Sequence, residues 1–187
     1  MFKKIHQNIF SMALCLCFAI YVPMANGAEK IAGTVAKLAG QLSLENENGV
    51  GEMSTGNIIH MQDLLRTGEN TRTDLRFMDG SVMTLGAEAA IIIDTLVYNP
   101  ENNESGGAIN LIKGAFHLIS GKISKSGGDF SIHTPTATIG IRGTDFIITQ
   151  SGEDLSVLLL DDGSVTVSNS QGSATLNQPG QGVDVKG

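Results

Sequence analysis

The stretch from Thr136 to Arg142 alternates strictly between apolar residues and small or polar ones, and this alternation limits the fold more than any other feature of the chain. Ala137, Ile139 and Ile141 share one face, which is the period of a β-strand with one buried side. Most of its residues are β-branched, as is usual in strands. The sequence therefore predicts a half-buried strand here.

The phase of this pattern changes after Arg142. The next apolar residues, Phe146 and Ile148, are even-numbered, so one extra residue has been inserted. Gly143 has no Cβ and can hold a bulge or a corner without steric cost. Pro135 has no N–H to donate, which favours the first position of a strand or a sheet edge.

Three separated segments together resemble a FecR-type domain. They are KGAFHLISGK at 113–122, TPTATIGIRGTDF at 134–146 and DDGSVTV at 161–167, and the resemblance covers about residues 56–167. It implies a periplasmic all-β module, best known as the sensing half of membrane-spanning regulators that relay receptor occupancy to a cytoplasmic sigma factor. Those regulators place a sigma-binding segment and a membrane helix before this domain. Here only a short signal sequence precedes it, so a stand-alone envelope module is expected.

The N-terminus has the layout of a secretory signal peptide. Two lysines precede an apolar run at 9–22, and Ala25 and Gly27 have the spacing of a signal-peptidase site. The run is shorter than the roughly 20 residues of a spanning helix. We expect cleavage after Gly27, with an uncleaved anchor as the alternative, and a single all-β domain over residues 28–187 in the periplasm without stable membrane insertion.

Composition excludes several classes of function. Both cysteines, Cys15 and Cys17, lie in the apolar run, so the mature chain has no disulfide and no thiol nucleophile. Residues 1–27 hold two of the 12 basic residues and none of the 19 acidic ones, which leaves 10 against 19 and a net charge of −9. Such a chain repels nucleic acid.

Short apolar runs separated by turns predict short antiparallel strands in a two-layer sandwich or roll, or a solenoid-like stack, with no helix of ordinary length. Asp79-Gly80 predicts a two-residue hairpin turn with Phe77 opposite Val82. The second Asp-Gly, at 162–163, predicts another hairpin; the two are either an internal duplication or, as we favour, independent uses of one turn. Residues 168–187 predict a last strand or partial disorder.

The candidate structural or interaction residues surround the phase change: Pro135, Gly140, Arg142, Gly143, Thr144 and Asp145. Arg142 lies on the polar side of an apolar strand, which predicts a partly buried guanidinium that pairs with a carboxylate (Asp145, Asp129 or Asp161) or with several backbone carbonyls. On that premise, Arg142→Ala would destabilise the fold by roughly 3 kcal/mol. A structural role for Arg142 at the Gly143 corner is favoured over ligand binding.

No pattern of catalytic or metal-binding residues is found. His60, His117 and His133 lack metal-ligand spacing, and no nucleophile elbow, calcium loop or phosphate loop occurs. We therefore expect no enzyme and no cofactor, but a module that interacts with another envelope protein or senses the envelope, with sheet-edge pairing as its mode. The alternative is a small-ligand or glycan-binding module that uses loops at 99–107 and 121–128.

Overall fold

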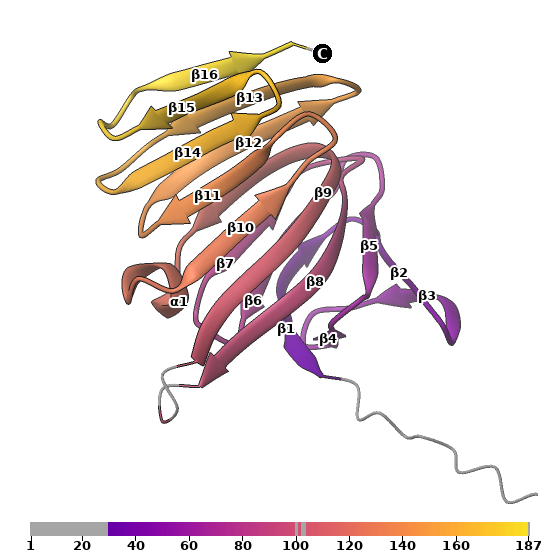
Figure 1. The fold of residues 1–187 in the computed structure, drawn as a ribbon. Coiled ribbons are helices and arrows are strands. Elements are labelled where there is room, and N and C mark those ends of the chain that lie inside the picture. The colour runs from indigo at the N-terminus through magenta and orange to yellow at the C-terminus, as the bar shows by residue number, and fades with distance from the viewer. Residues whose placement is uncertain (1–29, 100, 102–103, 187) are drawn as a thin grey trace, which may run out of the picture.

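The alternating segments become sixteen β-strands in the computed structural model, which describes residues 30–99, 101 and 104–186. They form two packed sheets joined through one long strand (Figure 1). The prediction of an all-β fold of short strands in two layers is confirmed. The predicted signal peptide at 1–27 lies outside the described residues.

We call the two layers sheet A and sheet B. In spatial order, sheet A contains β4 (Ile58–His60), β1 (Ile31–Ala39), β6 (Arg72–Phe77), β7 (Val82–Leu85), the second part of β9 (Glu104–Ile119), β12 (Asp145–Ser151), β13 (Asp154–Leu159) and β16 (Gly182–Val185). Sheet B contains β3 (Gly49–Met53), β2 (Leu42–Asn46), β5 (Leu64–Thr67), β8 (Ala90–Asn99), the first part of β9, β10 (Asp129–His133), β11 (Thr138–Arg142), β14 (Ser164–Asn169) and β15 (Gly172–Leu176). All neighbours are antiparallel except β9 and β10, so the arrangement is mixed.

The strand β9 belongs to both sheets because it bends at Gly114. Lys113 pairs with Ala90 in sheet B, whereas Ala115 pairs with Thr149 in sheet A. Gly114 has a φ of +120°, and a Cβ there would lie 2.5 Å from the Cβ of Ala89. Only glycine meets both demands. The residues on the two sides of Gly114 thus form one bent strand that serves both sheets.

The core lies between the two sheets and forms one cluster of buried side chains. Ile139 and Ile141 contribute from β11, and Phe146 and Ile148 contribute from β12, all at 4% exposure or less. The change of phase after Arg142 is therefore a corner: β11 ends in sheet B and β12 begins in sheet A, with Gly143 between them at a φ of +53°. The predicted corner at Gly143 is confirmed.

The first Asp-Gly hairpin exists, but its predicted register is wrong by one residue. Val82 pairs with Arg76 instead of Phe77. The Phe77 N–H donates to the Ser81 carbonyl oxygen at 3.0 Å, and Gly80 has a φ of +85°, which gives a three-residue loop with a left-handed last residue. The loop is longer because Asp79 turns inward, as described below.

The second predicted hairpin is wrong. β13 pairs with β12 and β16, whereas β14 pairs with β11 and β15, so residues 160–163 cross from sheet A to sheet B. The two Asp-Gly segments therefore have different topologies.

Parts of the two loops that the sequence predicted are regular elements. β9 begins at Glu104, so residues 104–107 of the predicted loop at 99–107 belong to a strand, in which Gly106 and Gly107 pair with β8 and β10. The predicted exposed connection at 121–128 holds the short helix α1 (Lys122–Lys125), whose Ile123 and Ser124 are buried. Residues 168–187, expected to hold a last strand or partial disorder, supply β15 and β16.

Candidate functional site

The chain passes from one sheet to the other after β9, after β11 and after β13, and we call these segments crossings. The three crossings lie next to one another and are joined by hydrogen bonds through Thr144. The Thr144 N–H donates to Ser120 Oγ at 3.0 Å, and Ser120 Oγ–H donates to the Thr144 carbonyl oxygen at 2.6 Å. Thr144 Oγ1–H donates to the Asp161 carbonyl oxygen at 2.9 Å. Thr144 thus joins the ends of β9, β11 and β13, and we call Ser120, Thr144 and Asp161 the corner column.

The corner column requires a close backbone approach at Gly163. This residue has a φ of +125°, and a Cβ there would lie 2.4 Å from the Gly143 carbonyl oxygen and 2.7 Å from that of Arg142. Gly163, the glycine of the second Asp-Gly, therefore has to be a glycine because the neighbouring corner leaves no room for a side chain. A structural role for Gly143 and Thr144 follows from this geometry.

Asp79 anchors α1 to the β6–β7 loop, and sequence reasoning assigned it only to a turn. Its side chain is 1% exposed and accepts hydrogen bonds from the Ser81 N–H at 3.0 Å, from the Ser81 hydroxyl and from the Ile123 N–H at 3.4 Å. The Asp79 carbonyl oxygen accepts from the Lys122 N–H at 2.9 Å. A buried carboxylate needs several donors, and this one has them. No local pattern pointed to Ile123 as a donor.

Two of the predicted residues lie in different places from those expected. Pro135 is exposed in the turn between β10 and β11, and it is not the first residue of a strand. Because it lies outside the strands, its lack of an N–H costs the sheet no hydrogen bond. Arg142 is exposed at the end of β11, and no ion pair joins it to a carboxylate among the described residues. The prediction of a partly buried, paired guanidinium is therefore wrong, because the polar face of β11 points to solvent.

Asp145 pairs with a histidine, not with Arg142. Its Oδ1 lies 2.5 Å from Nε2 of His117 on the neighbouring strand β9, with both side chains about one-third exposed. The pair lies on the outer face of sheet A. Among the described residues no group of three or more His, Cys, Asp or Glu side chains is placed to hold a metal ion.

Gly140 and Arg142 both line a shallow hollow on the outer face of sheet B. The hollow has a volume of about 330 Å³, and Asp129, Ser131 and Thr166 also contribute to it. Gly140 is not required by packing, because a Cβ there would meet only the Thr166 carbonyl oxygen, at 4.0 Å. The missing side chain leaves the hollow open.

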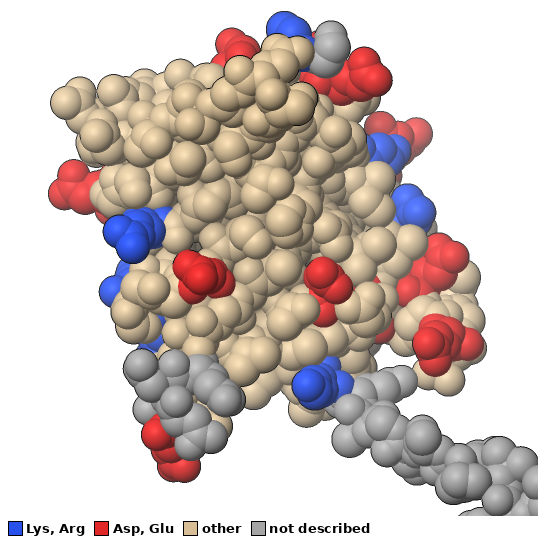
Figure 2. Space-filling view, in the orientation of Figure 1, with Lys and Arg blue, Asp and Glu red and all other residues tan. Residues whose placement is uncertain are grey.

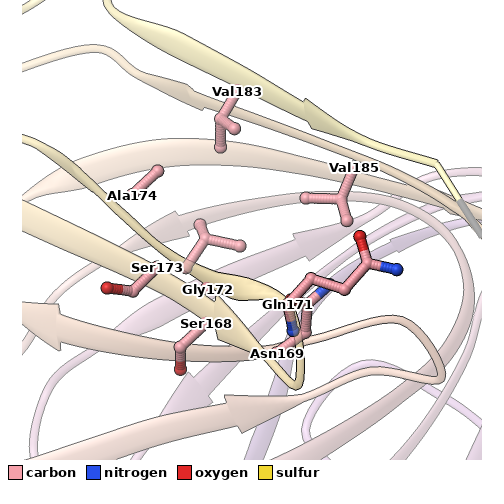
Figure 3. A pocket seen from close by; sticks show the side chains of 9 residues that line it. Ser168, Asn169, Gln171, Gly172, Ser173, Ala174, Val183 and Val185 are labelled. Carbon is pink, nitrogen blue, oxygen red and sulfur yellow. The ribbon is translucent and has the colours of Figure 1, made fainter.

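A second groove lies at the end of the molecule, between the edge strands β15 and β16. It has a volume of about 220 Å³. Figure 3 shows Val183 and Val185 pointing from β16 toward β15, which contributes Ala174. Val183 and Val185 are half-buried, and Val167 forms the apolar floor at 3% exposure. Within the described chain β15 pairs only with β14, and β16 only with β13.

The C-terminal part of the chain, which forms this end of the molecule, is acidic. Residues 144–187 contain six acidic side chains, at 145, 153, 154, 161, 162 and 184, against one basic side chain, Lys186. Figure 2 shows several Asp and Glu side chains at the end where β16 lies in Figure 1. Lys186 Nζ lies 3.2 Å from Asp154 Oδ2, so the one cation is already paired.

These features define a class: a two-sheet β protein whose crossings between the sheets are fixed by hydrogen bonds, and in whose described residues four edge strands, β3, β4, β15 and β16, pair on one side only. A profile described as "FecR protein" matches residues 63–166, which is 104 of the 187 residues. The chain therefore belongs to the FecR family. No match was found among curated proteins. Within the described residues, no helix has the length and apolar character needed to cross a bilayer.

Two crystal structures of a "putative anti-sigma factor" from Parabacteroides distasonis, at 1.65 and 2.50 Å resolution, are similar to this chain. Each aligns with a TM-score of 0.49 and 17% sequence identity. Each alignment covers 66% of this chain and 59% of the solved one, so the chain spans less than two thirds of that protein's length.

Proposed function

We propose that this FecR-family chain is a non-catalytic periplasmic module that binds another envelope protein and takes part in envelope sensing or signalling. Membership of the FecR family supports a regulatory role. The N-terminal lysines, apolar run and small residues support export across the inner membrane with cleavage after Gly27.

The main support for this proposal is the end of the molecule at which the edge strands β15 and β16 lie, which we call the open end. Exposed edge strands present unpaired N–H and C=O groups, and proteins commonly protect such edges with prolines, lysines or bulges. β15 reads Gly-Ser-Ala-Thr-Leu, without a charge or a proline, and it lies beside a second open edge. The two adjacent edges flank an apolar groove, and β16 carries one charged residue, Asp184, so together they suit the addition of a partner's strand.

Photocrosslinking in intact native cells tests this function. A photoreactive amino acid replaces Ser173 or Asp184 at the open end, Arg142 at the hollow, or Glu69 in an exposed turn as the matched control. We expect a periplasmic protein to be crosslinked at Ser173 or Asp184 and not at Glu69. Absence of crosslinks at every position, or intact protein in the cytoplasm, would contradict the proposal.

The hollow over Gly140 favours a second candidate function, binding of a small polar ligand such as an envelope glycan. Its walls carry hydroxyls and one charged group of each sign, Arg142 and Asp129, which suit a polar ligand. Thermal shift against cell-wall fragments tests it, with Gly140→Val as the control that fills the hollow. A shift that Gly140→Val leaves unchanged would contradict this candidate.

A further inference from the structure

The strand β16 has one free edge next to the apolar groove. Its other edge pairs with β13 from Gly182 opposite Leu158 to Val185 opposite Leu155. The hairpins β12–β13 and β14–β15 precede it in the chain, one in sheet A and the next in sheet B. β16 returns to sheet A as a single strand within the described residues, so its outer N–H and C=O groups can receive another strand.

The side chains of β16 indicate which residues an added strand would carry on the face that points into the groove. Val183 and Val185 point into the groove and are only half-buried, with Ala174 on the opposite wall (Figure 3). Residues directly opposite each other in paired strands share a face. A strand added beside β16 would therefore place small aliphatic residues, two positions apart, next to these valines.

The charge of β16 defines the outer face of the added strand. Asp184 lies between the two valines, is exposed, and accepts a hydrogen bond from Ser156 on β13. Its carboxylate can accept from a second donor. Because Lys186 is paired with Asp154 and residues 144–187 are otherwise acidic, a lysine or arginine opposite Asp184 complements this surface.

The same residues disfavour a second copy of this chain as the occupant. The register that places Val183 opposite Val185 of a second copy also places Asp184 opposite Asp184. Like charges in directly opposed positions are destabilising. The acidic ends of both copies add further repulsion.

We propose that the free edge of β16 binds an extended segment of a partner protein in which small aliphatic and basic residues alternate. The segment adds a strand to sheet A, buries Val183 and Val185, and pairs a cation with Asp184. This inference rests on the proposed function, of which it names the edge and the chemistry of the partner.

Short labelled peptides test the edge in vitro with the full mature protein. One peptide alternates valine and lysine, the second replaces lysine with glutamate, and the third places proline at the centre of the first. Fluorescence anisotropy measures binding, and NMR shifts of backbone amides locate it. We expect only the valine–lysine peptide to bind, with the largest shifts at residues 182–186 and weaker binding at high salt.

Two charge variants sharpen this test. Asp184→Lys is expected to weaken binding of the valine–lysine peptide by about three- to ten-fold and to favour the glutamate peptide. Asp184→Asn, which keeps the hydrogen bond from Ser156, should have an intermediate effect. Glu52→Lys makes the same charge change on the edge strand β3 and should have no effect.

Several results would overturn the inference. They are no binding of the valine–lysine peptide, equal binding of the glutamate or proline peptide, equal effects of Asp184→Lys and Glu52→Lys, and shifts confined to residues outside β16. These results leave the proposed function separately testable, since a partner crosslinked in cells at Ser173 or Arg142 but not at Asp184 would support the function and contradict the β16 edge.

Discussion

At the scale of single residues, the two Asp-Gly pairs show how one dipeptide can serve two purposes. Asp79 is buried and accepts from two backbone N–H groups and one hydroxyl, whereas Asp162 is exposed. We expect Asp79→Ala to lower the free energy of unfolding by about 2–4 kcal/mol, because three donors lose their acceptor. Asp162→Ala is the matched control and should change it by less than about 0.5 kcal/mol. Urea denaturation measures both, and equal effects would contradict the assigned role of Asp79.

Arg142 and Thr144 make a second comparison, within one motif. Arg142 is exposed, so Arg142→Ala should change the free energy of unfolding by less than about 0.5 kcal/mol. Thr144→Val loses the hydrogen bond to the Asp161 carbonyl oxygen inside the corner column and should cost about 1–2 kcal/mol. Thermal unfolding distinguishes them. A larger loss for Arg142→Ala than for Thr144→Val would restore the structural role for the guanidinium that the sequence predicted.

At the scale of elements, the bend in β9 depends on one glycine. Gly114 combines a positive φ with a close approach to Ala89, so Gly114→Ala is expected to cost about 3 kcal/mol or more. Gly152 also has a positive φ, +57°, but a Cβ there would have open space, so Gly152→Ala should cost about 1–2 kcal/mol. The difference measured by chemical denaturation contains the clash with Ala89 and the extra strain of a φ of +120° over one of +57°. Similar costs would contradict the assignment of the bend to Gly114.

The elements also show which parts of the fold the sequence could predict. The strand before Arg142 and the corner at Gly143 follow from local period and from the phase change, which neighbouring residues encode. The crossing at 160–163 could not be predicted in this way, because an Asp-Gly pair suits a hairpin turn as well as it suits a connection between two sheets. What decides between them is the packing of Gly163 against Gly143 and the bond from Thr144 to Asp161, contacts that a local pattern cannot show.

Of the two candidate sites, the residues of one could be named from the sequence and those of the other could not. Gly140 and Arg142 were named from the sequence and line one hollow, although the burial expected of Arg142 was wrong. The groove between β15 and β16 was not predicted, because the two edges come from different sheets and meet only when the crossings are known. Alternation at Val183 and Val185 was the one local indication of a strand there.

At the scale of the whole molecule, β9 is the centre and the edge strands are the periphery. β9 pairs with β8 and β10 in sheet B and with β7 and β12 in sheet A, whereas β3, β4, β15 and β16 each pair on one side within the described residues. Local opening requires less free energy where fewer buried contacts are broken. We therefore expect amide hydrogen exchange to be slowest at residues 107–118 and fastest in the four edge strands.

Hydrogen exchange with mass spectrometry measures this gradient and ties it to the proposed edge. In the free protein, peptides covering β16 should exchange much faster than those covering β9. With the valine–lysine peptide bound, exchange at β16 should slow, while β3, the edge strand at the far end of sheet B, should stay unchanged, because a strand added to one edge protects only the amides that it covers. Exchange at β16 as slow as at β9 in the free protein would show that this edge is already closed, and would contradict both its assignment as a free edge and the binding inferred from it.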